Sequence, residues 1–316
     1  MAKILITGGA GFIGAHAAKA LVTAGENVTI LDDFNDFLYP SGLKQARIAT
    51  FFTGDTRPKV IAGSILDAKL LQQLFTDGKF DQVVHLAAHA NPGVSVDKGD
   101  EYTLVNVLGT FNILRVCHEF DVVQLVMAGS SSVYNDEQTP FTESSYPLKP
   151  HSPYGASKAA AEIYCEMWSD LHGLPTTVLR FFSVYGPWGR PDMAPFILAQ
   201  QLLNDETIFL SKDRQRDFTY IDDVVAGILL ALERKLDFEV INLGRGEPVD
   251  LRAFVAALEA AAGKKAHIVD RDAPPGEMRV TFANIEKAKK LLGYEPKVSV
   301  EEGTKKLVDW LKDFEK

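Results

Sequence analysis

A glycine-rich turn near the N-terminus restricts the fold of this chain more than any other feature of its sequence. The segment TGGAGFIG begins at Thr7, directly after the apolar run Ile4–Ile6. Gly8, Gly11 and Gly14 allow a tight turn between a strand and a helix, and they let the backbone approach a pyrophosphate closely. Their spacing differs from the commoner G-x-G-x-x-G. The position between a predicted strand and a predicted helix nevertheless favours a dinucleotide-binding βα unit.

Strand and helix patterns alternate through the first half of the chain. Continuous apolar strands separated by amphipathic helices indicate a parallel sheet that is covered on both faces. Right-handed crossovers then favour a doubly wound, Rossmann-like arrangement. The expected strands are Ile4–Ile6, Val28–Leu31, Val83–Ala87 and Gln124–Ala128, and the expected helices include Gly14–Ala24, Asp67–Phe75 and Tyr102–Phe120.

The pattern changes after Arg180. The segment 183–195 is dense in glycine, proline and aromatic residues, which is typical of a connecting loop that contacts a ligand. Helical patterns then recur as far as Phe314. We therefore expect an α/β protein with two parts: a doubly wound domain of residues 1–182, to which residues 217–246 return, and a smaller, mixed α/β C-terminal lobe of residues 183–316.

Charge and cysteine content exclude several classes of function. The 33 basic and 42 acidic side chains give a net charge of −9, which argues against a nucleic-acid partner because such binding needs a basic surface. Two cysteines cannot form a disulfide framework or a four-cysteine zinc site. His85 and His89 lie in a predicted strand, where four residues span about 13 Å, so we expect no shared metal ion. No apolar stretch approaches the roughly 20 residues that cross a bilayer, and we expect a cytoplasmic protein without a membrane partner.

The acidic residue at the end of the second predicted strand indicates which dinucleotide binds. Asp32 stands where a carboxylate accepts hydrogen bonds from the adenosine ribose hydroxyls. The same carboxylate would repel a 2′-phosphate, so the sequence predicts NAD rather than NADP as the cofactor. A solvated turn residue is the alternative interpretation of Asp32.

A tyrosine and a lysine four residues apart are candidates for proton transfer. Of the nine tyrosines, only Tyr154 is followed by lysine at this spacing, and Lys158 then lies on the same face of a predicted helix. A phenol has a pKa near 10, but an adjacent ammonium and the positive nicotinamide ring of NAD would lower it. The strand that ends at Ala128 delivers Ser130 to the same edge of the sheet, where its hydroxyl can share the proton of a substrate. An isolated pair of this kind is commonly an ordinary surface pair, so the prediction depends on the glycine turn and the serines.

These motifs resemble the extended short-chain dehydrogenase/reductase family, the NAD-dependent nucleotide-sugar epimerases and dehydratases. The resemblance runs from TGGAGFIG through HLAAHA, SSSVY, YGASK, RFFSVYGPWGRPDM and RDFTYIDDVV to LGYEP. It implies that Tyr154 is the catalytic base, that Lys158 also binds the nicotinamide ribose and that Ser130 assists at the sugar hydroxyl. Ser64 stands where many members have an aspartate that contacts adenine, a departure that weakens this contact. The resemblance assigns NAD binding to residues 1–182 and nucleotide-sugar binding to residues 183–316, and it implies cofactor contacts at Gly8, Gly11, Phe12, Ile13, Gly14, Asp32, Ser64, Ile65, Leu86, Ala87, Ala88, Asn106 and Lys158.

Two segments, DDFNDFLYPSGLKQARI and RFFSVYGPWGRPDMAPF, look most like the branch that converts UDP-glucuronate to UDP-galacturonate through a 4-keto intermediate. That intermediate is a β-keto acid, which loses carbon dioxide unless its carboxylate is held away from the carbonyl π system. Arg190 is suited to this task because a guanidinium binds carboxylate bidentately. Ser183, Ser131 and Ser132 are candidates for further hydrogen bonds to the substrate carboxylate. For the UDP moiety the resemblance implies Arg216, with Arg279 and Glu277 as further candidates.

Other activities and an oligomeric state follow from the same resemblance. A UDP-glucuronate decarboxylase shares most of the motifs, and a neutral UDP-hexose 4-epimerase is a further alternative. A 4,6-dehydratase is disfavoured because Ser131 and Ser132 replace its usual Asp-Glu pair. A non-catalytic dinucleotide sensor would usually lack the tyrosine and the lysine. Members commonly dimerise through a four-helix bundle, so we expect a homodimer formed by helices 102–120 and 154–168.

Overall fold

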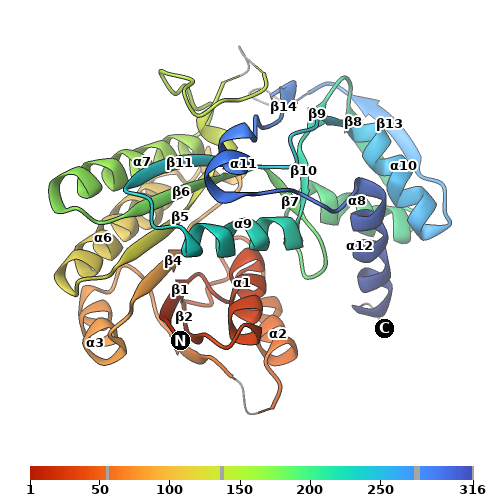
Figure 1. Cartoon of the computed structure of the whole chain (residues 1–316). Helices are drawn as coiled ribbons and strands as arrows, with labels where there is room; N and C mark the ends of the chain where they lie inside the picture. The colour runs from red at the N-terminus through yellow and green to blue at the C-terminus, as the bar shows by residue number, and fades with distance from the viewer. Residues whose placement is uncertain (55–56, 136–138, 274–277, 315–316) are drawn as a thin grey trace.

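A seven-stranded parallel sheet forms the centre of the computed structural model, which describes residues 1–54, 57–135, 139–273 and 278–314 (Figure 1). The strand order is β11–β6–β5–β4–β1–β2–β3, and every neighbouring pair is parallel. The order reverses between β1 and β4, which creates a crevice at the carboxyl ends of these strands. The strands are β1 (Lys3–Thr7), β2 (Asn27–Asp32), β3 (Lys59–Ala62), β4 (Gln82–His85), β5 (Gln124–Ser130), β6 (Thr176–Phe181) and β11 (Phe238–Leu243).

Alternating side chains of β1 show why helices cover both faces. Ile4 and Ile6 belong to one buried cluster, and Leu5 belongs to another on the opposite face. This alternation follows from the two-residue period of a strand, and it confirms the expected Rossmann-like, doubly wound fold. The first cluster is shared with α1 (Phe12–Thr23), α2 (Ser41–Phe51), α9 (Ile221–Glu233) and α11 (Glu286–Leu292), and the second with α3 (Ala68–Gly78), α6 (Gly109–Glu119) and α7 (Pro153–His172).

A smaller, mixed lobe lies beside the sheet. Its core joins α8 (Ala194–Leu203), α10 (Leu251–Ala262) and α12 (Val300–Phe314) to the parallel pair β8 (Thr207–Ser211) and β13 (His267–Arg271). Two further small sheets are β10 (Phe218–Tyr220) with β7 (Ser183–Tyr185), and β12 (Val249–Asp250) with β9 (Gln215–Arg216) and β14 (Val280–Thr281).

The chain leaves and re-enters the main sheet. After β9 and β10 in the lobe, α9 packs beside α1 and β11 becomes the edge strand next to β6. The expected domain division, with boundaries at residues 182 and 183 and the return of residues 217–246, stays a prediction. Within the described ranges, no helix combines the length and the apolar character needed to cross a membrane.

The segment expected as one helix from Tyr102 to Phe120 is interrupted. A short helix, α5 (Gly99–Tyr102), leads into the π-helical turn η1 (Thr103–Leu108), which continues into α6. Periodicity alone could not predict this turn, because its apolar residues remain compatible with a regular helix. The strand expected over Val83–Ala87 also ends earlier, at His85. Two single-turn helices, α4 (Pro92–Ser95) and η2 (Ser131–Val133), follow β4 and β5.

Candidate active site

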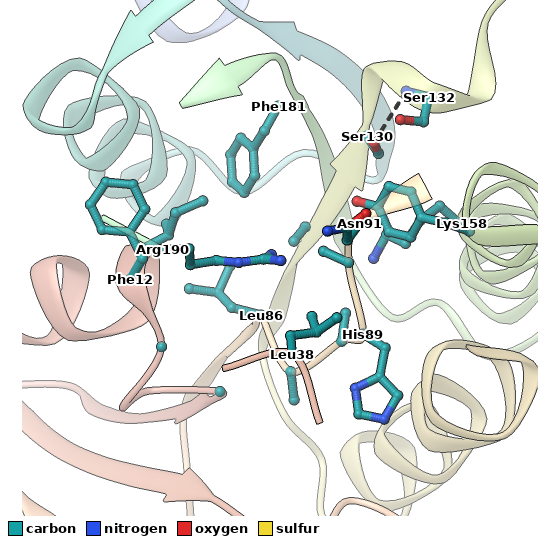
Figure 2. Close-up of a pocket in the computed structure, with 18 of the residues that line it drawn as sticks. Phe12, Leu38, Leu86, His89, Asn91, Ser130, Ser132, Lys158, Phe181 and Arg190 are labelled. Atoms are coloured by element: carbon teal, nitrogen blue, oxygen red, sulfur yellow. Dashed lines mark hydrogen bonds between the residues drawn. The ribbon is translucent and has the colours of Figure 1, made fainter. Parts of the chain in front are cut away.

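A cavity of about 600 Å³ opens at the carboxyl edge of the sheet, where the strand order reverses (Figure 2). The glycine turn, the ends of β2, β4 and β5 and the first turns of α7 all contribute to its wall. The structure thus brings together residues from distant parts of the sequence, from Gly8 to Thr281. The predicted residues that line it are Gly8, Gly11, Phe12, Ile13, Gly14, Asp32, Ser64, Ile65, Leu86, Ala87, Ala88, Ser130, Ser131, Ser132, Tyr154, Lys158, Ser183, Arg190 and Arg216.

The glycine turn has the shape that a dinucleotide requires. Gly8 has a φ of +67°, and a Cβ at Gly14 would overlap the carbonyl oxygen of Gly8. Gly11 is the N-cap of α1 and, as a glycine, has no side chain to cap the helix. The first N–H groups of α1 are therefore available to bind an anion. These backbone features fit a pyrophosphate at the end of α1.

Asp32 ends β2 inside the cavity. Its Oδ2 accepts a hydrogen bond from the Ala10 N–H at 3.0 Å, and its Oδ1 accepts one from the Phe34 N–H at 2.9 Å. Burial raises the pKa of Asp32, while Lys44 and these hydrogen bonds oppose the rise. The carboxylate therefore ties the end of β2 to the glycine turn.

Tyr154 is positioned by the start of α7. Ser152 caps this helix by accepting a hydrogen bond from the Gly155 N–H at 3.1 Å, and Ser95 Oγ accepts one from the Tyr154 N–H at 3.1 Å. The side chains of Tyr154 and Ser130 are hydrogen-bonded to each other. This contact joins the end of β5 to the first turn of α7.

The pKa of Tyr154 is raised in the protein alone. Burial raises it, and the Ser130 hydrogen bond and the charge of Arg190 only partly oppose this effect. Burial also lowers the pKa of Lys158 to about 8, against the opposing charge of Glu162. The expectation that an adjacent ammonium, together with the positive nicotinamide ring of NAD, lowers the phenol pKa stays a prediction, because in the protein alone burial outweighs the charge of Arg190.

A buried polar network lies behind Lys158. Glu162 and Arg180 form an ion pair with 2.7 Å between Oε2 and Nη2, and Arg180 Nη1 donates to the Tyr134 hydroxyl at 2.7 Å. Tyr134 in turn donates to Asn242 Oδ1 at 2.7 Å. The network joins α7 to β6 and β11, and its carboxylate favours the charged form of Lys158. The sequence analysis did not find it, since its members have no common local motif.

Arg190 enters the cavity from the side opposite Ser130 and Lys158 (Figure 2). Its Nη2 lies 2.6 Å from Asp192 Oδ2, and its Nε lies 3.0 Å from Asp192 Oδ1. Burial disfavours the charge, but this ion pair raises the pKa of Arg190. Asp192 Oδ2 also accepts a hydrogen bond from Asn91 Nδ2 at 3.0 Å. Two guanidinium nitrogens of Arg190, which was expected to bind a substrate carboxylate, are thus already hydrogen-bonded to the carboxylate of Asp192.

Two predicted residues do not reach the cavity. Asn106 lies behind the wall, where it accepts from the His89 N–H at 2.8 Å and donates to Ser157 Oγ at 2.9 Å. It therefore supports the residues after β4 and the start of α7 from behind the cavity wall, and its expected cofactor contact stays a prediction. Arg279 lies outside the lining, and its carbonyl accepts from the Gln215 N–H at 3.0 Å. Glu277 lies outside the described residues.

Several lining residues were missed by the sequence analysis. They come mainly from the segment after β2 and from the segment after β4. The acidic, aromatic stretch DDFNDFLYP was a signal for the first group, but it has no regular period. The missed residues include Leu38, Tyr39, Lys44, His89, Asn91, Met193 and Met278.

The doubly wound sheet and the glycine turn are typical of a dinucleotide-dependent enzyme. The Tyr154–Ser130 contact is typical of one that transfers the proton of a hydroxyl group. A model of the NAD dependent epimerase/dehydratase family matches residues 4–244. The chain belongs to this family, which confirms the resemblance seen in the motifs and makes NAD the cofactor.

Relatives and solved structures agree with this assignment over nearly the whole chain. A UDP-glucuronate 4-epimerase of Thermodesulfobacterium geofontis is 37% identical, with 99% of this chain and 97% of that protein covered. The crystal structure of UDP-glucuronic acid 4-epimerase from Bacillus cereus, in complex with UDP-glucuronic acid and NAD, superposes with a TM-score of 0.92 at 34% identity and covers 98% of this chain and 99% of that one. A UDP-glucose 4-epimerase of Thermotoga maritima gives 0.90 at 29% identity, with 99% of each chain covered.

Proposed function

We propose that this protein converts UDP-glucuronate to UDP-galacturonate by NAD-dependent inversion at C4. The observation that carries the proposal is the placement of Arg190, a cation whose side chain is 16% exposed, in the same cavity as the hydrogen-bonded Tyr154 and Ser130. A hydroxyl-directed base and a carboxylate-binding cation are the two groups that this substrate needs. The named activities of the relatives from T. geofontis and B. cereus support the same substrate.

In this mechanism Tyr154 removes the proton of the sugar O4, and Ser130 shares that proton through its hydrogen bond. The chemistry that NAD supplies when bound is removal of the C4 hydride and its return to the opposite face of the sugar. Tyr154 gives the proton back to O4 at the end, and no external oxidant is consumed because the hydride would also return to the sugar. Lys158 favours the phenolate through its charge, which compensates part of the cost of burial.

Arg190, Ser183, Ser131 and Ser132 hold the substrate carboxylate. Restraint of this group keeps its C–C bond out of line with the ketone π system and prevents loss of carbon dioxide. Because Asp192 already engages Nε and Nη2, the substrate must share Arg190 with Asp192 or displace it. This competition disfavours weakly binding anions.

The remaining assignments concern the ends of the two ligands. Residues 1–182, with residues 217–246, bind NAD through the predicted cofactor contacts, and residues 183–316 bind the nucleotide sugar. Arg216 lines the cavity and supplies positive charge for the diphosphate. Arg279 and Glu277 remain candidates for the uridine end.

Product analysis tests the proposed function. The NAD-loaded protein is incubated with UDP-glucuronate, and products are followed by NMR together with carbon dioxide release. UDP-galacturonate without carbon dioxide is the expected result. UDP-xylose with carbon dioxide would instead identify a decarboxylase, and turnover of UDP-glucose but not of UDP-glucuronate would identify a neutral hexose epimerase. Bound NAD without turnover of either sugar would indicate a sensor.

We also propose that the protein is a homodimer whose helices α6 and α7 form a four-helix bundle with their copies. Ile163 and Leu171 on α7 are 62% and 68% exposed, and Met167 lies between them at the same helical spacing. Leu104 and Leu108, in the turn that leads into α6, are also exposed. Such a stripe on neighbouring helices is typical of an interface.

Charged substitutions test this assembly. Ile163→Asp combined with Leu171→Asp should convert the dimer to a monomer, because two carboxylates would be desolvated at the interface. Phe209→Asp, an exposed apolar position on β8, is the matched control and should leave the mass unchanged. Sedimentation velocity measures the mass of each variant, and a monomeric wild-type protein would contradict the proposal.

A cytoplasmic location is proposed as well, supported by the free, buried Cys117 and Cys165, and cell fractionation tests it.

A further inference from the structure

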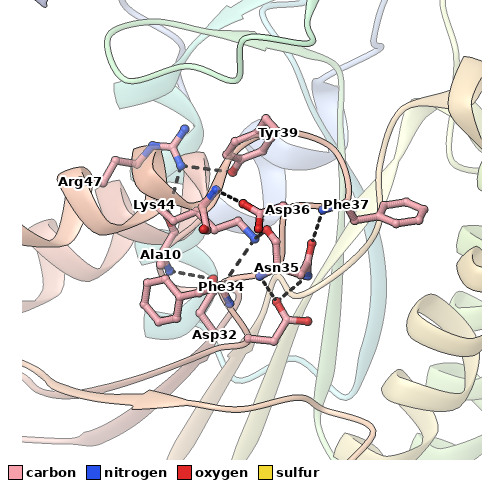
Figure 3. A network of polar contacts seen from close by, with 11 residues as sticks. Ala10, Asp32, Phe34, Asn35, Asp36, Phe37, Tyr39, Lys44 and Arg47 are labelled. Atoms are coloured by element: carbon pink, nitrogen blue, oxygen red, sulfur yellow. Dashed lines mark hydrogen bonds and ion pairs between the residues drawn. The ribbon is translucent and has the colours of Figure 1, made fainter.

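Arg47 is a fully buried arginine outside the set of predicted site residues (Figure 3). It lies in α2, and within the described part of the chain its hydrogen bonds go to uncharged acceptors. Nε donates to the Trp188 carbonyl at 2.9 Å, and Nη2 donates to the Gly189 carbonyl at 3.3 Å. Nη1 donates to the Ala10 carbonyl and to the Tyr39 hydroxyl, both at 3.2 Å. A buried guanidinium held this way is costly, which points to a role beyond packing.

One end of this contact set is the dinucleotide turn. Ala10 lies within the glycine turn, and its N–H donates to Asp32 while its carbonyl accepts from Arg47. The peptide groups on both sides of Ala10 are thus fixed by side chains from β2 and α2. Any shift of this turn when a pyrophosphate binds reaches Arg47 directly.

The other end is the loop that carries Arg190. Trp188 and Gly189 precede Arg190, and both of their carbonyls accept from Arg47. The loop is conformationally demanding, because Trp188 has a φ of +61° and Gly186 a φ of +148°. The Trp188 ring packs against Phe51 of α2, with ring centroids 5.8 Å apart, and against Trp310 of α12 at 5.4 Å. Such a backbone persists only where its surroundings hold it.

We propose that Arg47 is a positioning residue that ties the Arg190 loop to the dinucleotide turn, so that cofactor binding sets the geometry of the carboxylate site. A guanidinium suits this role because its planar fork can reach acceptors on two separate segments at once. Arg47 also brings a positive charge to the Ala10 carbonyl, next to the N-terminus of α1 where the anionic pyrophosphate is expected to bind. The inference rests on the proposed function where it concerns the substrate carboxylate, but the link between the two segments does not depend on it.

Hydrogen exchange tests the link without any turnover. Peptides that cover residues 183–193 are followed with and without NAD in the wild-type protein, in Arg47→Met and in Arg47→Lys. NAD should slow exchange in this segment about tenfold in the wild type, the effect of roughly one hydrogen bond, and should not slow it in Arg47→Met. Arg47→Lys keeps the positive charge but lacks the planar guanidinium. This variant should still bind NAD, but NAD should no longer slow hydrogen exchange in residues 183–193. A wild-type response to NAD in either variant would overturn the proposal.

Product partition tests the consequence for the carboxylate. With UDP-glucuronate, Arg47→Met and Arg47→Lys should each raise the decarboxylated fraction of product about tenfold and raise KM more than they lower kcat. Leu74→Ala, in the buried face of α3, is a control for lost stability and should keep the wild-type product ratio. An unchanged ratio in both Arg47 variants would refute the role. If the wild-type protein did not turn over UDP-glucuronate, the proposed function would fail, and the exchange experiment alone would decide the role of Arg47.

Discussion

Replacing Tyr154 by phenylalanine should lower the rate of epimerisation by about 1,000-fold or more, in the upper part of the range for loss of a general base. The substitution removes the hydroxyl proposed to exchange a proton with the sugar O4, and Tyr39, the other phenol in the lining, has its hydroxyl hydrogen-bonded to Arg47. The ring itself remains, so the packing of α7 is kept. NAD binding should be retained because the glycine turn and Asp32 are untouched.

Tyr164→Phe is the matched control for this experiment. Tyr164 lies on the same helix, is 37% exposed and packs against Phe111, away from the cavity. Its variant should turn over like the wild type. Initial rates with UDP-glucuronate and the amount of NAD that co-purifies are measured for both variants. Normal turnover by Tyr154→Phe would end the assignment of Tyr154 as the base, whereas loss of bound NAD would mean that the substitution disturbed the cofactor site instead.

The pKa of Tyr154 explains why the phenol alone is a poor base. Burial stabilises the neutral form, and the protein groups that oppose burial do not reverse the shift. Burial also lowers the pKa of Lys158 to about 8, so this amine, four residues along the same helix, loses its charge as the pH rises above that value. Catalysis should therefore require the positive nicotinamide ring next to Tyr154, and this dependence links the proton transfer to the oxidised cofactor.

The sequence predicted the parts of the site that are local. Gly8, Gly11 and Gly14 lie within one turn, and Tyr154 and Lys158 lie within one helix, so their spacing alone determines their relative placement. The sheet could be predicted for a similar reason, because apolar runs such as Ile4–Ile6 alternate with helical periods. Right-handed crossovers then favoured a doubly wound arrangement of these strands.

Contacts between distant segments could not be predicted in this way. Arg47 reaches carbonyls that follow it by more than 140 positions, and Arg180 meets Glu162 and Tyr134 through the packing of β6 against α7. No local pattern distinguishes such arginines from surface ones. The burial that raises the pKa of Tyr154 could not be predicted either, because it is a property of the assembled cavity.

Replacing Arg190 by alanine should abolish clean epimerisation. Formation of UDP-galacturonate should fall about 100-fold, a loss typical of a bidentate charge-assisted contact, and UDP-xylose with carbon dioxide should appear. Without the guanidinium the carboxylate of the 4-keto intermediate can rotate until its C–C bond aligns with the ketone π system. Asp192 would also lose its bidentate partner and repel the substrate, which should raise KM. NMR of the nucleotide sugars and trapping of carbon dioxide measure the two outcomes.

Two further variants separate these effects. Arg190→Ala combined with Asp192→Asn removes the leftover carboxylate, so its KM should fall back toward the wild-type value while decarboxylation persists. Arg245→Ala is the matched control, because Arg245 pairs with Glu247 outside the cavity and its loss should leave the products unchanged. Decarboxylation that persists in the double variant would assign the restraint to Arg190 itself, since repulsion by Asp192 is then gone. Intact, clean epimerisation by Arg190→Ala would instead refute carboxylate restraint by this residue and leave it to the serines at the end of β5.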